Sequence, residues 1–169
     1  MLKKTSLLIA FVFLCCFSFV HAQAQKPSTP EQRKQVVEIA TFLETNPLAK
    51  EAKEQRSALL LFLIQAPDIT VTICSGVLGD SKKLKGDYES ELVGQLPFSQ
   101  AKFVIQNPDK ANDEAAVQLA GVEGVLRMWQ AIKTAKPKAK FPLMDELLQK
   151  QQVGTLAEHV QAGWKGCKK

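Results

Sequence analysis

Apolar residues recur along most of this chain at the three- and four-residue spacing of one helix face, and proline, glycine or asparagine interrupts the pattern at intervals. Such spacing predicts amphipathic helices. Proline at a first helical position and asparagine or glycine near a last turn predict where they begin and end. We therefore expect an all-α fold, a compact bundle of five to seven helices. The expected helices cover residues 30–45, 47–65, 88–106, 112–135, 142–151 and 154–164.

Two of these helices are expected at the centre of the bundle. Residues 59–64 are apolar on every side of a helix, which is typical of a buried helix. In the longest helix a near-heptad stripe is formed by Leu119, Val122, Leu126 and Trp129. Gly121 and Gly124 in the same helix each cost about 1 kcal/mol relative to alanine, so we expect a neighbouring segment to approach them closely.

Two parts of the pattern are ambiguous. Pro97 lies inside an otherwise helical segment and predicts either a kink or two separate helices. Asp87 is expected to cap this segment. Residues 68–79 fit a strand by the alternation of their β-branched side chains and fit a helix by their spacing. Asp68 as a cap and Gly79 as a terminator favour a short helix there.

The N-terminus has the pattern of a secretory signal. Lys3 and Lys4 precede an uninterrupted apolar run over residues 7–17, and small residues follow. This run is shorter than the roughly 20 residues of a membrane-spanning helix. We expect residues 1–22 to be removed by cleavage after Ala22, with Ala24 as the second choice.

Two other interpretations of the N-terminus remain open. The segment could stay attached as an uncleaved anchor, although it has no polar face. Cys15 or Cys16 could carry a lipid, although the preceding residue is not small in either case. After cleavage we expect a flexible lead-in over residues 23–28, a single helical domain over residues 29–169 and no membrane span.

The cysteine count predicts one disulfide. Cleavage discards Cys15 and Cys16 and leaves Cys74 and Cys167, and an even number of cysteines in an exported chain implies a bridge. Two buried free thiols are the alternative. A disulfide agrees with an exported protein in the periplasm or outside the cell. Together with His159, the two cysteines do not supply the four ligands of a structural zinc site.

No arrangement of residues typical of catalysis stands out. His159 is the only histidine after residue 22, and Ser75 lies in no nucleophile motif. Three pairs of neighbouring carboxylates cannot share a helix face, because residues one or two positions apart point in different directions. They are Glu89 with Glu91, Asp113 with Glu114, and Asp145 with Glu146. We therefore expect no catalytic, cofactor or metal site. We expect these acids to lie in the first turns of helices instead, where the helix dipole stabilises negative charge.

The net charge and the distribution of basic residues do not indicate a particular class of partner. Without Lys3 and Lys4, 20 of the 22 basic residues remain beside 17 acidic ones, so the net charge is +3. Nucleic-acid binders concentrate arginine and lysine on one face, whereas the three arginines here are dispersed among the helices, so we expect no nucleic-acid partner. Residues 136–140 (Lys-Pro-Lys-Ala-Lys) form a basic hinge, either a solvated turn or a contact for an acidic surface.

These observations predict a function class without a specific activity. We expect an exported, non-enzymatic interaction or structural module that binds a protein partner or an apolar ligand. The alternatives are a helical carrier of an apolar small molecule and an enzyme of unrecognised type.

Overall fold

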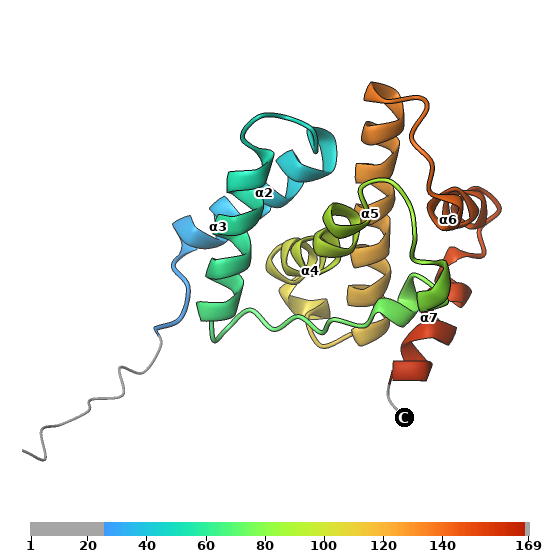
Figure 1. Cartoon of the computed structure of the whole chain (residues 1–169). Coiled ribbons are helices and arrows are strands. Elements are labelled where there is room, and N and C mark those ends of the chain that lie inside the picture. The colour runs from blue at the N-terminus through green and yellow to red at the C-terminus, as the bar shows by residue number, and fades with distance from the viewer. Residues whose placement is uncertain (1–25, 168–169) are drawn as a thin grey trace, which may run out of the picture.

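The computed structural model describes residues 26–167, and the regular structure of this part is helical throughout (Figure 1). Six α-helices and three short 3-10 turns follow one another there without a strand. The expected all-α bundle is therefore confirmed, whereas the predicted signal over residues 1–22 lies outside the described residues. The α-helices are α2 (Pro30–Thr45), α3 (Ala52–Gln65), α4 (Glu89–Gln106), α5 (Glu114–Ala135), α6 (Pro142–Gln152) and α7 (Leu156–Cys167).

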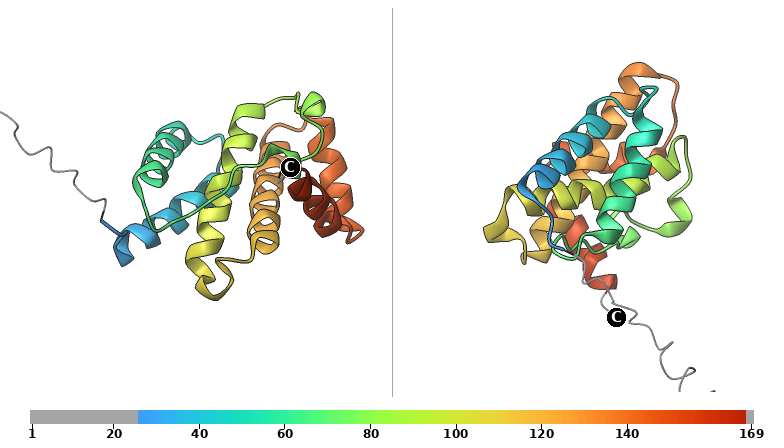
Figure 2. Two further views of the ribbon diagram at one scale, coloured as in Figure 1. Left: turned by 90° about the horizontal axis from the view of Figure 1, so that it is seen from below. Right: turned by 90° about the vertical axis from the view of Figure 1, so that its left-hand side faces the viewer.

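Two clusters of buried side chains lie side by side and meet at α4. The larger one surrounds α5 and includes residues of α6 and α7, and the smaller one lies between α2, α3 and α4. Leu92 and Leu96 of α4 belong to the larger cluster, whereas Phe98 and Ala101 of the same helix belong to the smaller. Figures 1 and 2 show α2 and α3 on one side of the α4–α5 pair and α6 and α7 on the other.

The stripe predicted for the longest helix lies at the centre of the larger cluster. Three of its four residues are fully buried, and Leu119 is half-buried at the edge. The ring of Trp129 packs edge-on against Phe141 with 6.2 Å between the ring centroids. The indole Nε1 donates a 2.8 Å hydrogen bond to Asp145 Oδ1 of α6. This satisfies the one polar atom of a large buried side chain.

The prediction that residues 59–64 lie at the centre of the bundle is wrong. α3 lies at the outside of the molecule and packs mainly on α2 (Figures 1 and 2). Leu59 is buried, but Leu60, Leu61 and Ile64 are 47%, 57% and 69% exposed. A helix that is apolar on every side must expose one face when its neighbours cover only the other.

The helix expected to begin at Pro47 begins at Ala52 instead. Asn46 ends α2 rather than starting α3, and its backbone N–H donates to Phe42 O at 2.7 Å. A turn occupies residues 47–51. Asn46 and Pro47 do mark a break between two helices, but a turn of five residues separates the break from the start of α3.

Residues 68–79 form neither the favoured helix nor a strand. They run irregularly as far as the short 3-10 turn η1 (Ser75–Val77). Ile69 packs into the smaller cluster, whereas Val77 and Leu78 pack into the larger one. An extended chain covers about 3.3 Å per residue, whereas a helix covers only about 1.5 Å per residue. A helix over the same residues would therefore cover less than half the distance, so an extended segment connects the two clusters more readily.

α4 continues through Pro97 as a single helix, so the alternative of two helices is wrong. Asp87 does not cap it either. Its Oδ2 accepts a 2.8 Å hydrogen bond from Lys140 N, and its own N–H donates to Lys140 O at 2.9 Å. Tyr88 occupies the cap position with φ 62°, the only non-glycine residue in the described chain with a positive φ.

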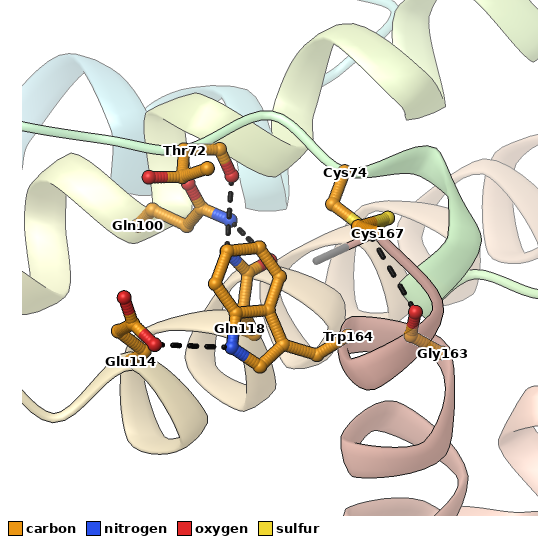
Figure 3. Close-up of a disulfide and its surroundings, with 8 residues drawn as sticks. All are labelled: Thr72, Cys74, Gln100, Glu114, Gln118, Gly163, Trp164 and Cys167. Atoms are coloured by element: carbon orange, nitrogen blue, oxygen red, sulfur yellow. Dashed lines mark hydrogen bonds between the residues drawn. A yellow bond between two sulfur atoms is a disulfide. The ribbon is translucent and has the colours of Figure 1, made fainter. Parts of the chain in front are cut away.

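Cys74 and Cys167 form the expected disulfide, which joins the segment before η1 to the end of α7 (Figure 3). Their Cα atoms lie 6.2 Å apart, within the normal range for a bridge. Beside the bridge, α7 approaches η1 so closely that a methyl group on Gly163 would overlap the carbonyl of Gly76. The lack of a side chain at Gly163 and the disulfide together allow α7 to pack directly against the segment around η1.

The chain reaches the first helix by way of an anchor at Asp68. Its carboxylate accepts hydrogen bonds from the backbone N–H of Ser28 at 2.9 Å and from the Ser28 hydroxyl at 2.7 Å, and it pairs with the Arg33 guanidinium at 2.6 Å. Burial alone would raise the pKa of Asp68, but these donors outweigh it and lower the pKa to about 2. Asp68, expected as a helix cap, thus fixes the start of the domain.

We expect the anchor to weaken in acid. Because the folded pKa lies below the unfolded value of about 3.9, its contribution to stability is present above about pH 4 and is lost as the pH falls towards 2. Asp68→Asn should therefore lower the melting temperature at pH 6 and make a much smaller difference at pH 2.5. Asp109→Asn at an exposed position serves as the control, and an Asp68→Asn effect that stays the same at both pH values would contradict the anchor.

Candidate functional site

The candidate site is the exposed apolar surface formed by Leu60, Leu61 and Ile64, which we call the α3 face. Leu60 and Leu61 lie one helical turn before Ile64, so the three side chains share one side of α3. Together with Ser57 they occupy positions i, i+3, i+4 and i+7. Contiguous apolar patches of this kind on soluble proteins mark interaction sites, whereas single exposed apolar residues are common.

The opposite side of α3 holds the helix in place. Ala52 and Leu59 are buried, and the half-buried Phe62 and Leu63 pack against the smaller cluster. The inward face is therefore occupied by its own core contacts. The α3 face is presented on a fixed helix rather than on a loop.

An open hollow lies between α2 and α3. Ile39 and Phe42 provide its apolar lining, and Glu38, Glu51 and Gln55 complete it. Its volume is about 270 Å³.

A buried carboxylate joins α2, α4 and α5. Glu44 is 2% exposed and accepts hydrogen bonds from Ser99 Oγ at 2.8 Å and Lys102 Nζ at 2.6 Å. Arg127 reaches it from α5 with Nε at 2.8 Å. This cluster cannot be seen in the sequence, because its four residues come from three helices and no local pattern distinguishes them.

This cluster is suited to holding helices together and not to proton transfer. Burial raises the pKa of Glu44, but the hydrogen bonds from Arg127, Lys102 and Ser99 outweigh burial and leave the pKa below its ordinary value. The carboxylate is thus ionised at neutral pH, and its oxygens are already bonded. An acid or base catalyst needs a pKa near the working pH instead.

The close approach expected at Gly121 and Gly124 is confirmed. A methyl group on Gly121 would lie 3.2 Å from the backbone oxygen of Leu96 in α4. One on Gly124 would overlap Ser99 and lie 2.8 Å from Glu44 Oε1. These two glycines therefore allow α4 and the Glu44 cluster to pack directly on α5.

We expect Gly124→Ala to destabilise the protein by about 2 kcal/mol or more, because the new methyl group overpacks the helix contact and displaces a buried hydrogen bond. Gly94→Ala in α4 is the matched control. Nothing lies within 4 Å of a methyl group at Gly94, so it should be neutral or stabilise by up to about 1 kcal/mol. Urea unfolding of both variants checks this, and equal stability of the two would contradict the packing described.

His159 and Ser75 are not joined by a hydrogen bond. His159 is half-buried on α7, and its ring lies near Gly79. Its Nε2 is buried and has no hydrogen-bond partner within the described residues. Within residues 26–167, no group of three or more His, Cys, Asp or Glu side chains is placed to hold a metal ion.

The paired carboxylates have separate structural roles near helix starts. Asp113 caps α5 by accepting from Ala116 N at 3.1 Å, and Glu114 accepts from the indole of Trp164 at 3.3 Å (Figure 3). Asp145 accepts the Trp129 bond described above. These acids lie in or just before first turns, as expected, and so do Glu89 and Glu91 of α4.

No protein-family model, curated protein or solved structure matches this chain. None of the helices within residues 26–167 combines the length and apolarity needed to cross a membrane. The disulfide indicates an oxidising compartment.

Proposed function

We propose that this chain is an exported, non-enzymatic binding module that holds a partner protein through the α3 face. The observation that carries the proposal is the exposure of Leu60, Leu61 and Ile64, which are 47%, 57% and 69% exposed on one side of a fixed helix. Exposed leucine and isoleucine side chains favour binding, because their burial against a partner removes apolar surface from water.

The spacing of the α3 face supports one mode of binding. An amphipathic helix that lies in a partner's groove contacts it through residues at i, i+3, i+4 and i+7. Ser57, Leu60, Leu61 and Ile64 have this spacing. We therefore infer that α3 is the inserted helix and that the partner supplies an apolar groove.

Export is part of the proposal. The charged and apolar N-terminus supports a cleaved signal, and the disulfide supports an oxidising destination, the periplasm or the exterior. Mass spectrometry of the protein from its native host should find a mature start near Gln23 or Gln25. Recovery of the chain with an intact Met1 would contradict cleavage.

Carriage of an apolar small molecule has less support. The hollow between α2 and α3 is open to solvent, whereas a small-molecule pocket encloses most of the surface of its ligand. The larger core cluster is filled by fully buried side chains, among them Trp129 and Phe141.

The proposal is tested by placing charge on the α3 face. Leu61→Glu with Ile64→Glu should lower the affinity for the partner that co-purifies with the wild-type protein at least tenfold, because charged groups resist transfer to an apolar contact. Val153→Glu is the matched control, since Val153 is 66% exposed outside the α3 face. Both variants should keep the wild-type circular-dichroism spectrum, because exposed substitutions rarely change stability by more than about 0.5 kcal/mol. Full partner binding by the folded double variant would contradict the proposal.

A further inference from the structure

Two lysine-rich segments that are far apart in the sequence meet at their C-terminal ends. Residues 80–87 and the hinge at 136–140 are joined by the two hydrogen bonds between Asp87 and the backbone of Lys140, at 2.8 and 2.9 Å. Gly86 lies so close to Phe141 that no side chain would fit between them. We call their six lysines the lysine patch. They are Lys82, Lys83, Lys85, Lys136, Lys138 and Lys140.

The lysine patch has an excess of positive charge. All six side chains are exposed, and none forms a salt bridge with a carboxylate of the described chain. The same two segments contain only two acids, Asp80 and Asp87. Asp80 accepts from the backbone N–H of Lys82 at 2.9 Å, and Asp87 accepts from that of Lys140. Both carboxylates therefore accept from backbone N–H groups, and within residues 26–167 the six lysine side chains have no carboxylate partner.

A hollow marks the edge of the patch. Lys136 and Lys138 line it together with Asp87, Tyr88 and Ala139, and its volume is about 440 Å³. Tyr88 also lines a second hollow, which contains Glu89 and Glu91 at the start of α4. Tyr88 therefore separates a hollow lined by lysines from a hollow lined by acids. Only the hollow beside the hinge is expected to attract an anion.

The chemistry of the patch favours a diffuse anionic surface. Arginine binds a single phosphate or carboxylate with two parallel hydrogen bonds, whereas lysine acts as a point charge on a flexible stem. The patch contains six lysines and no arginine, spread over two loops. We propose that the lysine patch binds the headgroups of an anionic phospholipid membrane from the aqueous side.

This inference does not depend on the α3 face. α3 and the hinge lie on different sides of the α4–α5 pair (Figure 1). A protein held at a membrane by the patch can therefore still present α3 to its partner. Clustered lysines near an anionic bilayer each strengthen binding by roughly fivefold, and salt weakens it.

Vesicle co-sedimentation of the processed protein tests the inference. Vesicles of three parts phosphatidylcholine to one part phosphatidylglycerol should bind the protein, and pure phosphatidylcholine should not. The variant Lys85→Gln, Lys136→Gln, Lys138→Gln should bind about a hundredfold more weakly, from roughly fivefold per lysine. The control Lys50→Gln, Lys53→Gln, Lys110→Gln has the same net charge with the patch intact and should stay within a few-fold of the wild type.

The competing outcomes are distinct. Equal binding by the patch variant and the control would show that net charge alone acts and would overturn the inference. Equal binding of the wild type to both vesicle types would show that the lysines are not needed and would overturn it as well. Absence of binding to either vesicle type would also overturn it, and an acidic protein would then replace the membrane as the partner. Free glycerol phosphate at millimolar concentration should not displace the protein, and displacement would identify a site for a single phosphate instead. The variants should melt at the wild-type temperature, because all the substituted side chains are exposed.

Discussion

Replacing Trp129 by alanine should lower the free energy of unfolding by about 3 to 5 kcal/mol, the range for deleting a large buried aromatic side chain. Trp129 is fully buried on α5, contacts Phe141 and donates its indole hydrogen to Asp145. The substitution leaves a cavity at the centre of the larger cluster and leaves Asp145 without this donor. Urea unfolding followed by circular dichroism measures the change.

A second aromatic residue provides the control for this prediction. Phe62 is half-buried on the outer helix α3, so Phe62→Ala should cost clearly less than Trp129→Ala. If the two variants lose the same stability, the larger cluster is not the centre of the fold.

Opening the disulfide should have an effect of similar size. The bridge spans 93 residues of sequence, and the chain-entropy model gives a stabilisation of about 4 to 5 kcal/mol for such a loop, as an upper estimate. A reducing agent should therefore lower the melting temperature markedly. The same agent should leave the double variant Cys74→Ser, Cys167→Ser unchanged, which separates reduction from other effects of the reagent. Equal melting temperatures for the wild type with and without reductant would contradict a stabilising bridge.

The sequence predicts the fold well where a local signal is enough. The stripe on α5 is a regular repeat within one helix, and Pro30 and Pro142 mark the first residues of α2 and α6. The disulfide follows from the cysteine count once the predicted signal is set aside. These features need no knowledge of what lies beside them.

Prediction from the sequence fails where the structure of a segment depends on the segments that pack against it. Residues 59–64 look buried because they are apolar, but burial requires a cover on every side, and α3 receives it on one side only. Residues 68–79 have the composition of a helix or a strand, yet the distance between the two clusters keeps them extended. Asp87 looks like a cap but bonds to Lys140, 53 positions away.

The same limit applies to the candidate site. The apolar segment of α3 is visible in the sequence, but its exposure, on which the binding proposal rests, is not. Glu44 has no local signal at all, since its partners Ser99, Lys102 and Arg127 lie in other helices. The basic hinge at 136–140 is visible in the sequence, but only the pairing of Asp87 with Lys140 shows that it meets the segment at 80–87.

The most direct test of the binding proposal is site-specific photo-crosslinking in the native host. A photoreactive amino acid replaces Leu61 in one strain and Val153 in another, because both positions are exposed and apolar but only Leu61 belongs to the α3 face. We predict a discrete crosslinked product, of the mass of this chain plus one partner, from position 61 and not from position 153. The same pattern from both positions, or no product from position 61 in folded and exported protein, would contradict the account.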